Sequence, residues 1–197
     1  MTYTNIIKTV DKVEGDLIDL GFGKGAVLSS IIESMNNDEI LTRNIWLYDS
    51  FKGYPKPSKH DQNSFEEGGS NRPIQPAYDI VNTINSHVHI KEGWIEDTLI
   101  ASHENNSVAI AHLDLGAYES TSFALSLLDT VVKQDGVFII SNYKTTFPGV
   151  DRAVDRYVEE KEYSINIADT IGFIYKPVIS LKVTKKKVNR TWSSTLT

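Results

Sequence analysis

Short apolar runs alternate with amphipathic segments along most of the chain. Runs rich in valine, isoleucine and aromatic residues predict strands over 16–20, 44–49, 87–90, 108–114 and 136–141. Between them, apolar residues recur at helical spacing over 25–35, 77–85 and 118–132. Strands that are apolar along their whole length and separated by helices are typical of a parallel sheet covered on both faces. The pattern therefore predicts an α/β fold.

The last part of the chain adds one helix and two strands to this pattern. Residues 148–161 carry an apolar stripe, and 163–169 and 171–176 read as strands. A mostly parallel, seven-stranded sheet with helices on both faces is the expected result. One long stretch, about 50–76, has no periodic pattern. Loops of this length often cover a site, so we expect it to be a lid at the substrate mouth.

Length and charge limit the possible functions. A chain of 197 residues suits one domain, which we place at 1–176. The net charge of −6 argues against nucleic acid as a partner. The chain lacks an apolar run of membrane-spanning length, and its first residues lack the apolar core of a signal peptide, so we expect a cytoplasmic protein without a membrane partner. Residues 177–197 form a basic extension, expected to be solvated.

The first chemical signal is a glycine turn between a strand and a helix. The predicted strand carries Asp19 near its end, Phe22 lies within the turn, and glycines follow at 21, 23 and 25. Such a turn lets the backbone approach a nucleotide-like ligand closely. Asp49 ends the next predicted strand, where a carboxylate commonly accepts hydrogen bonds from ribose hydroxyls.

The spacing G-x-G-x-G, with an acid before it, favours S-adenosylmethionine over a dinucleotide. Asp19 would lie near an ammonium group, whereas it would repel a pyrophosphate. Two alternatives remain open at this point. Asp19 could simply cap the helix that follows, and the chain could be a nicotinamide-dependent enzyme with unusual glycine spacing.

Six blocks occur in an order that resembles a known family. They read GDLIDLGFGKGA, LYDSFKGYPKP, EGWIEDTL, HLDLGAYESTSFALSLL, DGVFIISNY and PGVDRAVDRYVEE. The chain resembles the macrocin O-methyltransferase (TylF-like) family over residues 14–176. The resemblance implies a Rossmann-like class I methyltransferase fold, S-adenosylmethionine as methyl donor, and a hydroxyl of a small molecule, typically a sugar, as acceptor.

The resemblance also implies which residues bind the methyl donor. Asp49 corresponds to the ribose-binding acid, with Ser50 and Phe51 beside it. Gly93 and Trp94 follow the third strand, where this fold holds the adenine, and Asp97 is a candidate for the same pocket. Plain core packing is the alternative for Trp94, and a helix cap is the alternative for Asp97.

The sequence departs from the family at its metal site. Family members carry a cluster of acids after the fourth and fifth strands, but this chain keeps only Asp114, with Gly116, Ser141 and Asn142 at the other positions. Asp114 and Asn142 are the remaining candidate ligands. Because Mg²⁺ is held mainly by anionic oxygens, we expect at most a weakly bound ion.

Without a tight metal, another group must activate the acceptor hydroxyl. Asp114 is expected at the floor of the donor pocket, and His60 and Lys144 are further candidates for catalysis. His112, inside a strand, is expected to pack near the sheet. A catalytically silent binding or assembly module is the alternative, motivated by Gly116, Ser141 and the short segment before the first strand. Residues 177–183, PVISLKV, could pair with a second chain in a homodimer.

Overall fold

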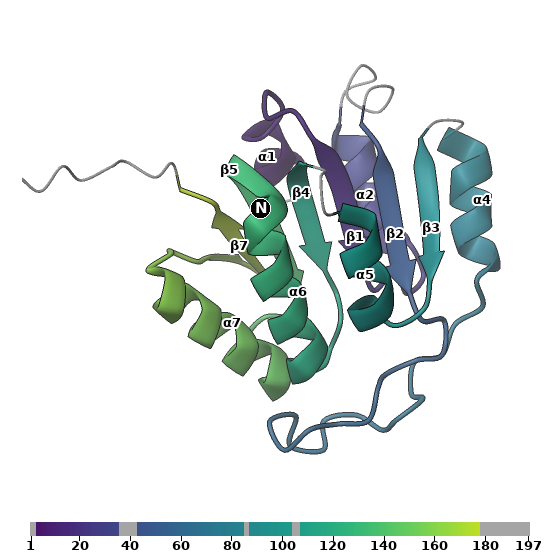
Figure 1. The fold of residues 1–197 in the computed structure, drawn as a ribbon, viewed down its shortest axis with the longest axis vertical. Coiled ribbons are helices and arrows are strands. Elements are labelled where there is room, and N and C mark those ends of the chain that lie inside the picture. Colours follow the sequence, from purple (N-terminus) through teal and green to yellow (C-terminus); the bar gives the residue numbers. More distant parts are fainter. Residues whose placement is uncertain (1–2, 36–42, 85–86, 104–106, 178–197) are drawn as a thin grey trace, which may run out of the picture.

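The sheet follows the order that the alternating pattern predicts, with an antiparallel pair at one edge. The computed structural model describes residues 3–35, 43–84, 87–103 and 107–177. Within these ranges seven strands form one sheet in the order β3-β2-β1-β4-β5-β7-β6 (Figure 1). The strands are β1 (Asp16–Leu20), β2 (Ile45–Asp49), β3 (Val88–Glu92), β4 (Val108–Leu113), β5 (Val132–Ser141), β6 (Asn166–Ala168) and β7 (Ile171–Tyr175).

The first five strands are parallel to their neighbours, and β7 runs antiparallel to both β5 and β6. This arrangement confirms the expected mostly parallel sheet. Two layers of helices cover it. The helices are α1 (Tyr3–Lys8), α2 (Ala26–Ser34), α4 (Gln75–Ile84), α5 (Ile95–His103), α6 (Tyr118–Val131) and α7 (Pro148–Lys161).

Each face of the sheet has its own apolar core. One core joins α5, α6 and α7 to one face, through residues such as Leu99, Leu128 and Val154. The other joins α1, α2 and α4 to the opposite face, through residues such as Ile7 and Leu28. Strands buried on both sides explain why the central runs are apolar throughout rather than alternating.

Three elements differ from the sequence prediction. Helices α1 and α5 were not expected, because six residues of α1 and the weakly amphipathic α5 give little periodic signal. Strand β5 begins four residues earlier than Gly136, because Val132 already pairs with Val108.

In the basic extension, residues 178–197 lie outside the described ranges. Nearly all of the segment 177–183, proposed to pair with a second chain, therefore lies outside them too.

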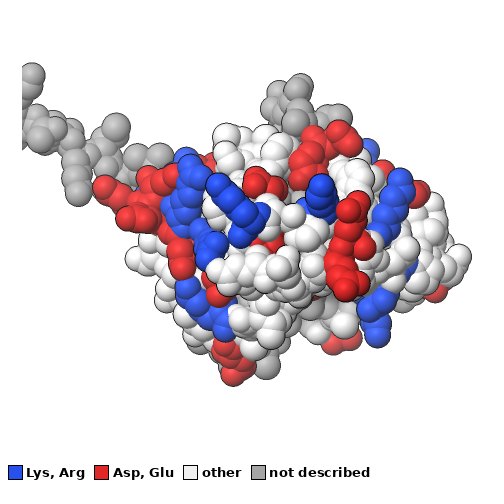
Figure 2. Space-filling view, turned by 90° about the horizontal axis from the view of Figure 1, so that it is seen from below, with Lys and Arg blue, Asp and Glu red and all other residues white. Residues whose placement is uncertain are grey.

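The parallel strands end at one edge of the sheet, and the long loop lies below that edge (Figure 1). The irregular stretch runs from Ser50 to Ile74, close to the predicted boundaries. Figure 2 views the molecule from below, on this side. Acidic and basic side chains are interspersed there around a broad uncharged area. Ligands of open α/β sheets bind at this carboxyl end of the strands.

Candidate active site

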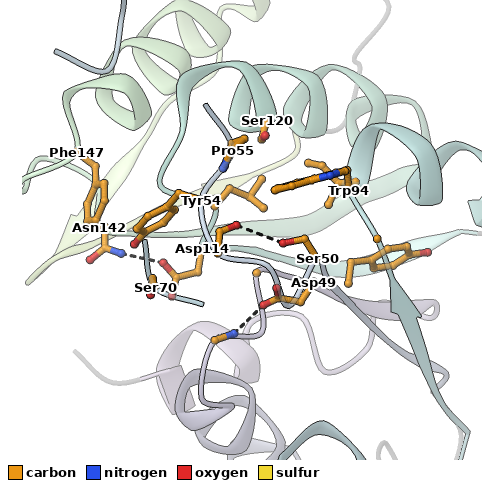
Figure 3. A pocket seen from close by; sticks show the side chains of 17 residues that line it. Asp49, Ser50, Tyr54, Pro55, Ser70, Trp94, Asp114, Ser120, Asn142 and Phe147 are labelled. Atoms are coloured by element: carbon orange, nitrogen blue, oxygen red, sulfur yellow. Dashed lines mark hydrogen bonds between the residues drawn. The ribbon is translucent and has the colours of Figure 1, made fainter. Parts of the chain in front are cut away.

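A cavity of about 190 Å³ opens where strands β1, β2, β4 and β5 end. Its walls come from the connections that follow these strands and from the long loop (Figure 3). The lining residues are Gly21, Gly23, Tyr48, Asp49, Ser50, Gly53, Tyr54, Pro55, Ser70, Gly93, Trp94, Ile95, Asp114, Leu115, Ser120, Asn142 and Phe147. Loops between strand ends and helices thus converge on one cavity.

The glycine turn brings the backbone directly to the cavity. Gly21 has a φ of +83°, and a Cβ there would clash with the backbone carbonyl of Asp114. Only glycine combines this conformation with so close an approach. Phe22 and Gly25 lie behind the turn, since a Cβ on Gly25 would come within 2.6 Å of the Phe22 ring. Of the turn residues, Gly21 and Gly23 line the cavity.

Asp49 is held at the end of β2 by the glycine turn itself. Its Oδ2 accepts a hydrogen bond from the Gly23 backbone N–H at 3.1 Å, and its Oδ1 accepts one from the Phe51 N–H at 2.7 Å. Each carboxylate oxygen has a second lone pair for a further donor. The carboxylate is therefore fixed in orientation, and it lines the cavity where a diol could donate to it.

Three buried polar residues from adjacent strands form a chain below the cavity. The His112 Nδ1 donates to Asp19 Oδ1 at 2.5 Å, and the His112 Nε2 lies 2.8 Å from Ser141 Oγ. Asp19 and His112 are each only 1% exposed. Asp19 Oδ2 is buried without a hydrogen-bond partner among the described residues. His112 packs within the sheet, as expected, and its imidazole is also the side-chain hydrogen-bonding partner of the buried Asp19 carboxylate.

Asp114 lies at the centre of the cavity wall, next to Asn142. The Asn142 Nδ2 donates to Asp114 Oδ1 at 2.8 Å (Figure 3). Burial raises the pKa of Asp114 above its ordinary value; His112 opposes the shift, and the nearby charges of Asp19 and Asp49 add to it. Among the described residues, no side chain bonds the second oxygen, Oδ2, of Asp114.

Trp94 and Gly93 line the cavity on the side of Asp49, so the indole faces the site. Ser50 also lines it and accepts a hydrogen bond from the Lys52 N–H. Asp97 is exposed in the first turn of α5, where a negative charge favours the helix. The structure therefore does not place Asp97 in the cavity.

The two other candidate catalytic groups lie outside the cavity. Lys144 pairs with Asp155 at 2.6 Å and is 45% exposed, and this partner raises the pKa of its ammonium group, which disfavours a role as base. His60 stacks on Tyr118, with ring centroids 4.1 Å apart. Its neighbour Asp61 accepts the Tyr118 N–H at 2.8 Å, which fastens the long loop to the start of α6.

Several residues of the cavity, two of them aromatic, have no signal in the sequence. Tyr54 and Phe147 line the site together with Pro55, Leu115 and Ser120. Tyr54 lies in the loop that was expected at the substrate mouth, but no periodic pattern indicates which of its residues point inward. Phe147 precedes the proline that starts α7, a position that carries no signal for a site.

The residues around Asp114 do not fit a resident divalent cation. The amide nitrogen of Asn142, rather than its oxygen, faces the carboxylate. Across the described ranges, no three His, Cys, Asp or Glu side chains gather as a metal site would require. Gly116 supplies no ligand, and aromatic rings fill the space beside it. Hard cations need several oxygen ligands, so this donor set is too poor.

No helix in the described part of the chain is both long and apolar enough to span a bilayer.

Two relatives of known activity resemble the chain. A Streptomyces olivaceus protein, 8-demethyl-8-(2,3-dimethoxy-alpha-L-rhamnosyl)-tetracenomycin-C 4'-O-methyltransferase, is 25% identical over 143 residues, which cover 68% of this chain and 54% of the relative. Mycinamicin III 3''-O-methyltransferase of Micromonospora griseorubida is 22% identical over 171 residues, covering 81% and 66%. The matched regions thus span less than two thirds of either relative.

A solved structure confirms the fold class. The calicheamicin methyltransferase CalS11 superposes with a TM-score of 0.76 at 16% identity, covering 87% of this chain and 76% of that one. The macrocin-O-methyltransferase (TylF) family profile matches residues 3–176. That match includes the glycine turn, Asp49, Asp114 and every described strand. The chain therefore belongs to the macrocin O-methyltransferase family.

Proposed function

We propose that this protein transfers a methyl group from S-adenosylmethionine to a hydroxyl of a sugar-containing small molecule. One observation carries the proposal: a single cavity holds the glycine turn and Asp49 on one side and, in its wall, Asp114, whose Oδ2 is not bonded by any described side chain. A nucleoside-binding half and a proton acceptor thus share one space in a member of a methyltransferase family.

The donor half is formed by Gly21, Gly23, Asp49 and Trp94. The bare backbone of the turn admits a ligand closely, Asp49 accepts ribose hydroxyls, and the Trp94 indole packs against a flat base. Asp19 is buried below the cavity and does not line it, so it favours a bound ammonium group only through the field of its negative charge. When bound, S-adenosylmethionine supplies an activated methyl group on sulfur.

Asp114 acts on the acceptor. With S-adenosylmethionine bound, Oδ2 would accept the proton that the acceptor hydroxyl loses as its oxygen takes the methyl group from sulfur, and S-adenosylhomocysteine would be the second product. Burial makes this carboxylate a stronger base than an ordinary aspartate, because it raises the pKa of Asp114. Asn142 holds the other oxygen and so fixes the direction of the carboxylate.

The acceptor class follows from the relatives and from the surface around the cavity. The Streptomyces relative is named for methylation on a rhamnosyl group. The uncharged area on the side of the cavity (Figure 2) suits a neutral sugar better than a strongly charged ligand. We therefore propose a deoxysugar, free or attached to a larger metabolite, as acceptor.

A multiple-turnover assay tests the proposal. Methyl-labelled S-adenosylmethionine is incubated with rhamnosides in the presence of EDTA, and methylated sugar is counted per enzyme molecule by mass spectrometry. More than one product per chain, lost in Asp114→Asn, supports the proposal. If the chain binds S-adenosylhomocysteine but no rhamnoside is methylated with or without Mg²⁺, the reaction proposed here is wrong, and a catalytically silent binding module becomes the better interpretation.

A further inference from the structure

Two aromatic side chains, Tyr54 and Phe147, line the cavity beside Asp114. Figure 3 shows Trp94 and Asp49 on one side of Asp114, and Tyr54, Phe147 and Asn142 on the other. All of them line the same cavity. Because the Asp49 side suits the methyl donor, the Tyr54 and Phe147 side is left for the acceptor.

The rings of Tyr54 and Phe147 fill the space beside Gly116. Its φ is +70°, and a Cβ added there would lie 2.6 Å from Tyr54 Cε1 and 3.3 Å from Phe147 Cε1. The 2.6 Å contact would require the Tyr54 ring to move, and the 3.3 Å contact would require Phe147 to move by a few tenths of an ångström. No side chain larger than hydrogen therefore fits at position 116 while Tyr54 keeps its place, and the rings occupy the volume that a second acidic side chain would need.

The Tyr54 ring is held from several directions. Its centroid lies 4.8 Å from that of Phe65 and 5.9 Å from that of Phe147, both in tilted contacts. Its backbone is tied to the far end of the same loop, because Tyr54 N donates to Gly69 O at 2.8 Å and Gly68 N donates to Tyr54 O at 2.9 Å. The ring is thus a preformed wall rather than a free side chain.

The phenol group of Tyr54 stays a hydrogen-bond donor. Burial raises the pKa of Tyr54 above its ordinary value, contact with the Ser70 hydroxyl opposes the shift, and the charge of Asp114 adds to it. A neutral phenol at the edge of an aromatic wall, with Ser70 and Asn142 nearby, combines an apolar face with a few polar groups. Sugars have the matching shape: a face of C–H groups edged by hydroxyls.

We propose that Tyr54 and Phe147 form the acceptor subsite, which binds a pyranose by its C–H face and presents a hydroxyl to Asp114 without a bridging metal ion. This inference rests on the proposed function and names the contact that selects the acceptor. In this subsite, stacking on the two rings binds the sugar. The Asp114 carboxylate and the Tyr54 phenol select which hydroxyl reacts.

Saturation-transfer NMR with methyl α-L-rhamnopyranoside, in the presence of excess S-adenosylhomocysteine, tests the subsite. With the wild-type chain, saturation should pass most strongly to those pyranose C–H protons of the rhamnoside that face the aromatic rings. Tyr54→Leu and Phe147→Leu should weaken rhamnoside binding by about three- to tenfold, the equivalent of one aromatic contact. Tyr54→Phe keeps the ring and should bind the rhamnoside nearly as the wild type does.

Tyr78→Leu is the matched control, because Tyr78 is 47% exposed on α4 and does not line the cavity. Calorimetric titration with S-adenosylhomocysteine shows that each variant retains its donor half. Equal rhamnoside affinity in the wild type and both leucine variants, or no saturation transfer from the wild type to the rhamnoside, overturns the subsite. If the wild type does not bind S-adenosylhomocysteine either, the proposed function itself falls.

Discussion

Replacing His112 with alanine should destabilise the protein severely. The side chain is buried and joins Asp19 to Ser141 across three strands. Without the imidazole, the carboxylate of Asp19 remains buried, and no described side chain is left to bond either of its oxygens. Leaving a buried carboxylate without its hydrogen-bonding partner typically costs about 3–5 kcal/mol. Since small domains unfold with about 5–15 kcal/mol, this loss is a large part of the total.

Urea denaturation, followed by circular dichroism, measures the free energy of unfolding of each variant. His89→Ala is the matched control: His89 is exposed on β3 and stacks on Trp46 with ring centroids 4.1 Å apart. Its loss should cost about 1 kcal/mol or less. The slope of the unfolding free energy against urea concentration, the m-value, should be the same in each variant. An unchanged m-value would show that the unfolded states are comparable.

A double variant separates the charge from the cavity that the alanine leaves. Asp19→Asn in the His112→Ala background removes the uncompensated charge and should recover about 1–2 kcal/mol, a coupling in the range of contacting residues. If His112→Ala costs less than His89→Ala, or if the second substitution only adds to the loss, the buried pair does not act as described.

Other substitutions test the roles assigned within the site. Asp114→Asn should lower kcat by about 10²–10⁴-fold and change the Kd of S-adenosylhomocysteine little, as measured by steady-state kinetics and calorimetry. Because burial raises the pKa of Asp114, kcat/KM of the wild type should fall on acidification at a pH above the ordinary aspartate range. The native chain also holds that proton more tightly than the unfolded chain. Its stability should therefore decline as pH rises through the raised pKa, and urea titrations of Asp114→Asn should lack this decline. Lys144→Met removes an exposed ion pair with Asp155, so kcat should stay within about twofold and stability within about 1 kcal/mol; a large loss of kcat would restore Lys144 as a candidate. EDTA should leave the turnover rate unchanged, and a loss reversed by Mg²⁺ would show that the donor set was misjudged.

Much of the fold can be predicted from the apolar pattern because the central strands are buried on both faces. Strand β4 is the clearest case, since all six residues from Val108 to Leu113 are buried. The pattern fails where burial is partial or the element is short. Helix α1 gives too few residues for a period, and α5 has only a weak apolar stripe.

The proposed donor half of the site can be predicted from local sequence, because the glycine turn and Asp49 lie at strand ends that a parallel sheet brings together. The proposed acceptor half cannot. Tyr54 reaches the cavity because its loop folds back on Gly69, and Gly116 is explained only by the ring beside it. Asp19 and His112 are 93 residues apart, and the bond between them depends on strand register.

We propose above all that this cavity binds S-adenosylmethionine through the glycine turn and Asp49. Calorimetric titration of the chain with S-adenosylhomocysteine tests it directly. We expect one site in the wild type, affinity lower by about 10- to 100-fold in Asp49→Ala because hydrogen bonds to a charged group are lost, and unchanged affinity in Asp97→Ala. No binding at millimolar concentrations, or equal affinity in the wild type and Asp49→Ala, would contradict the claim.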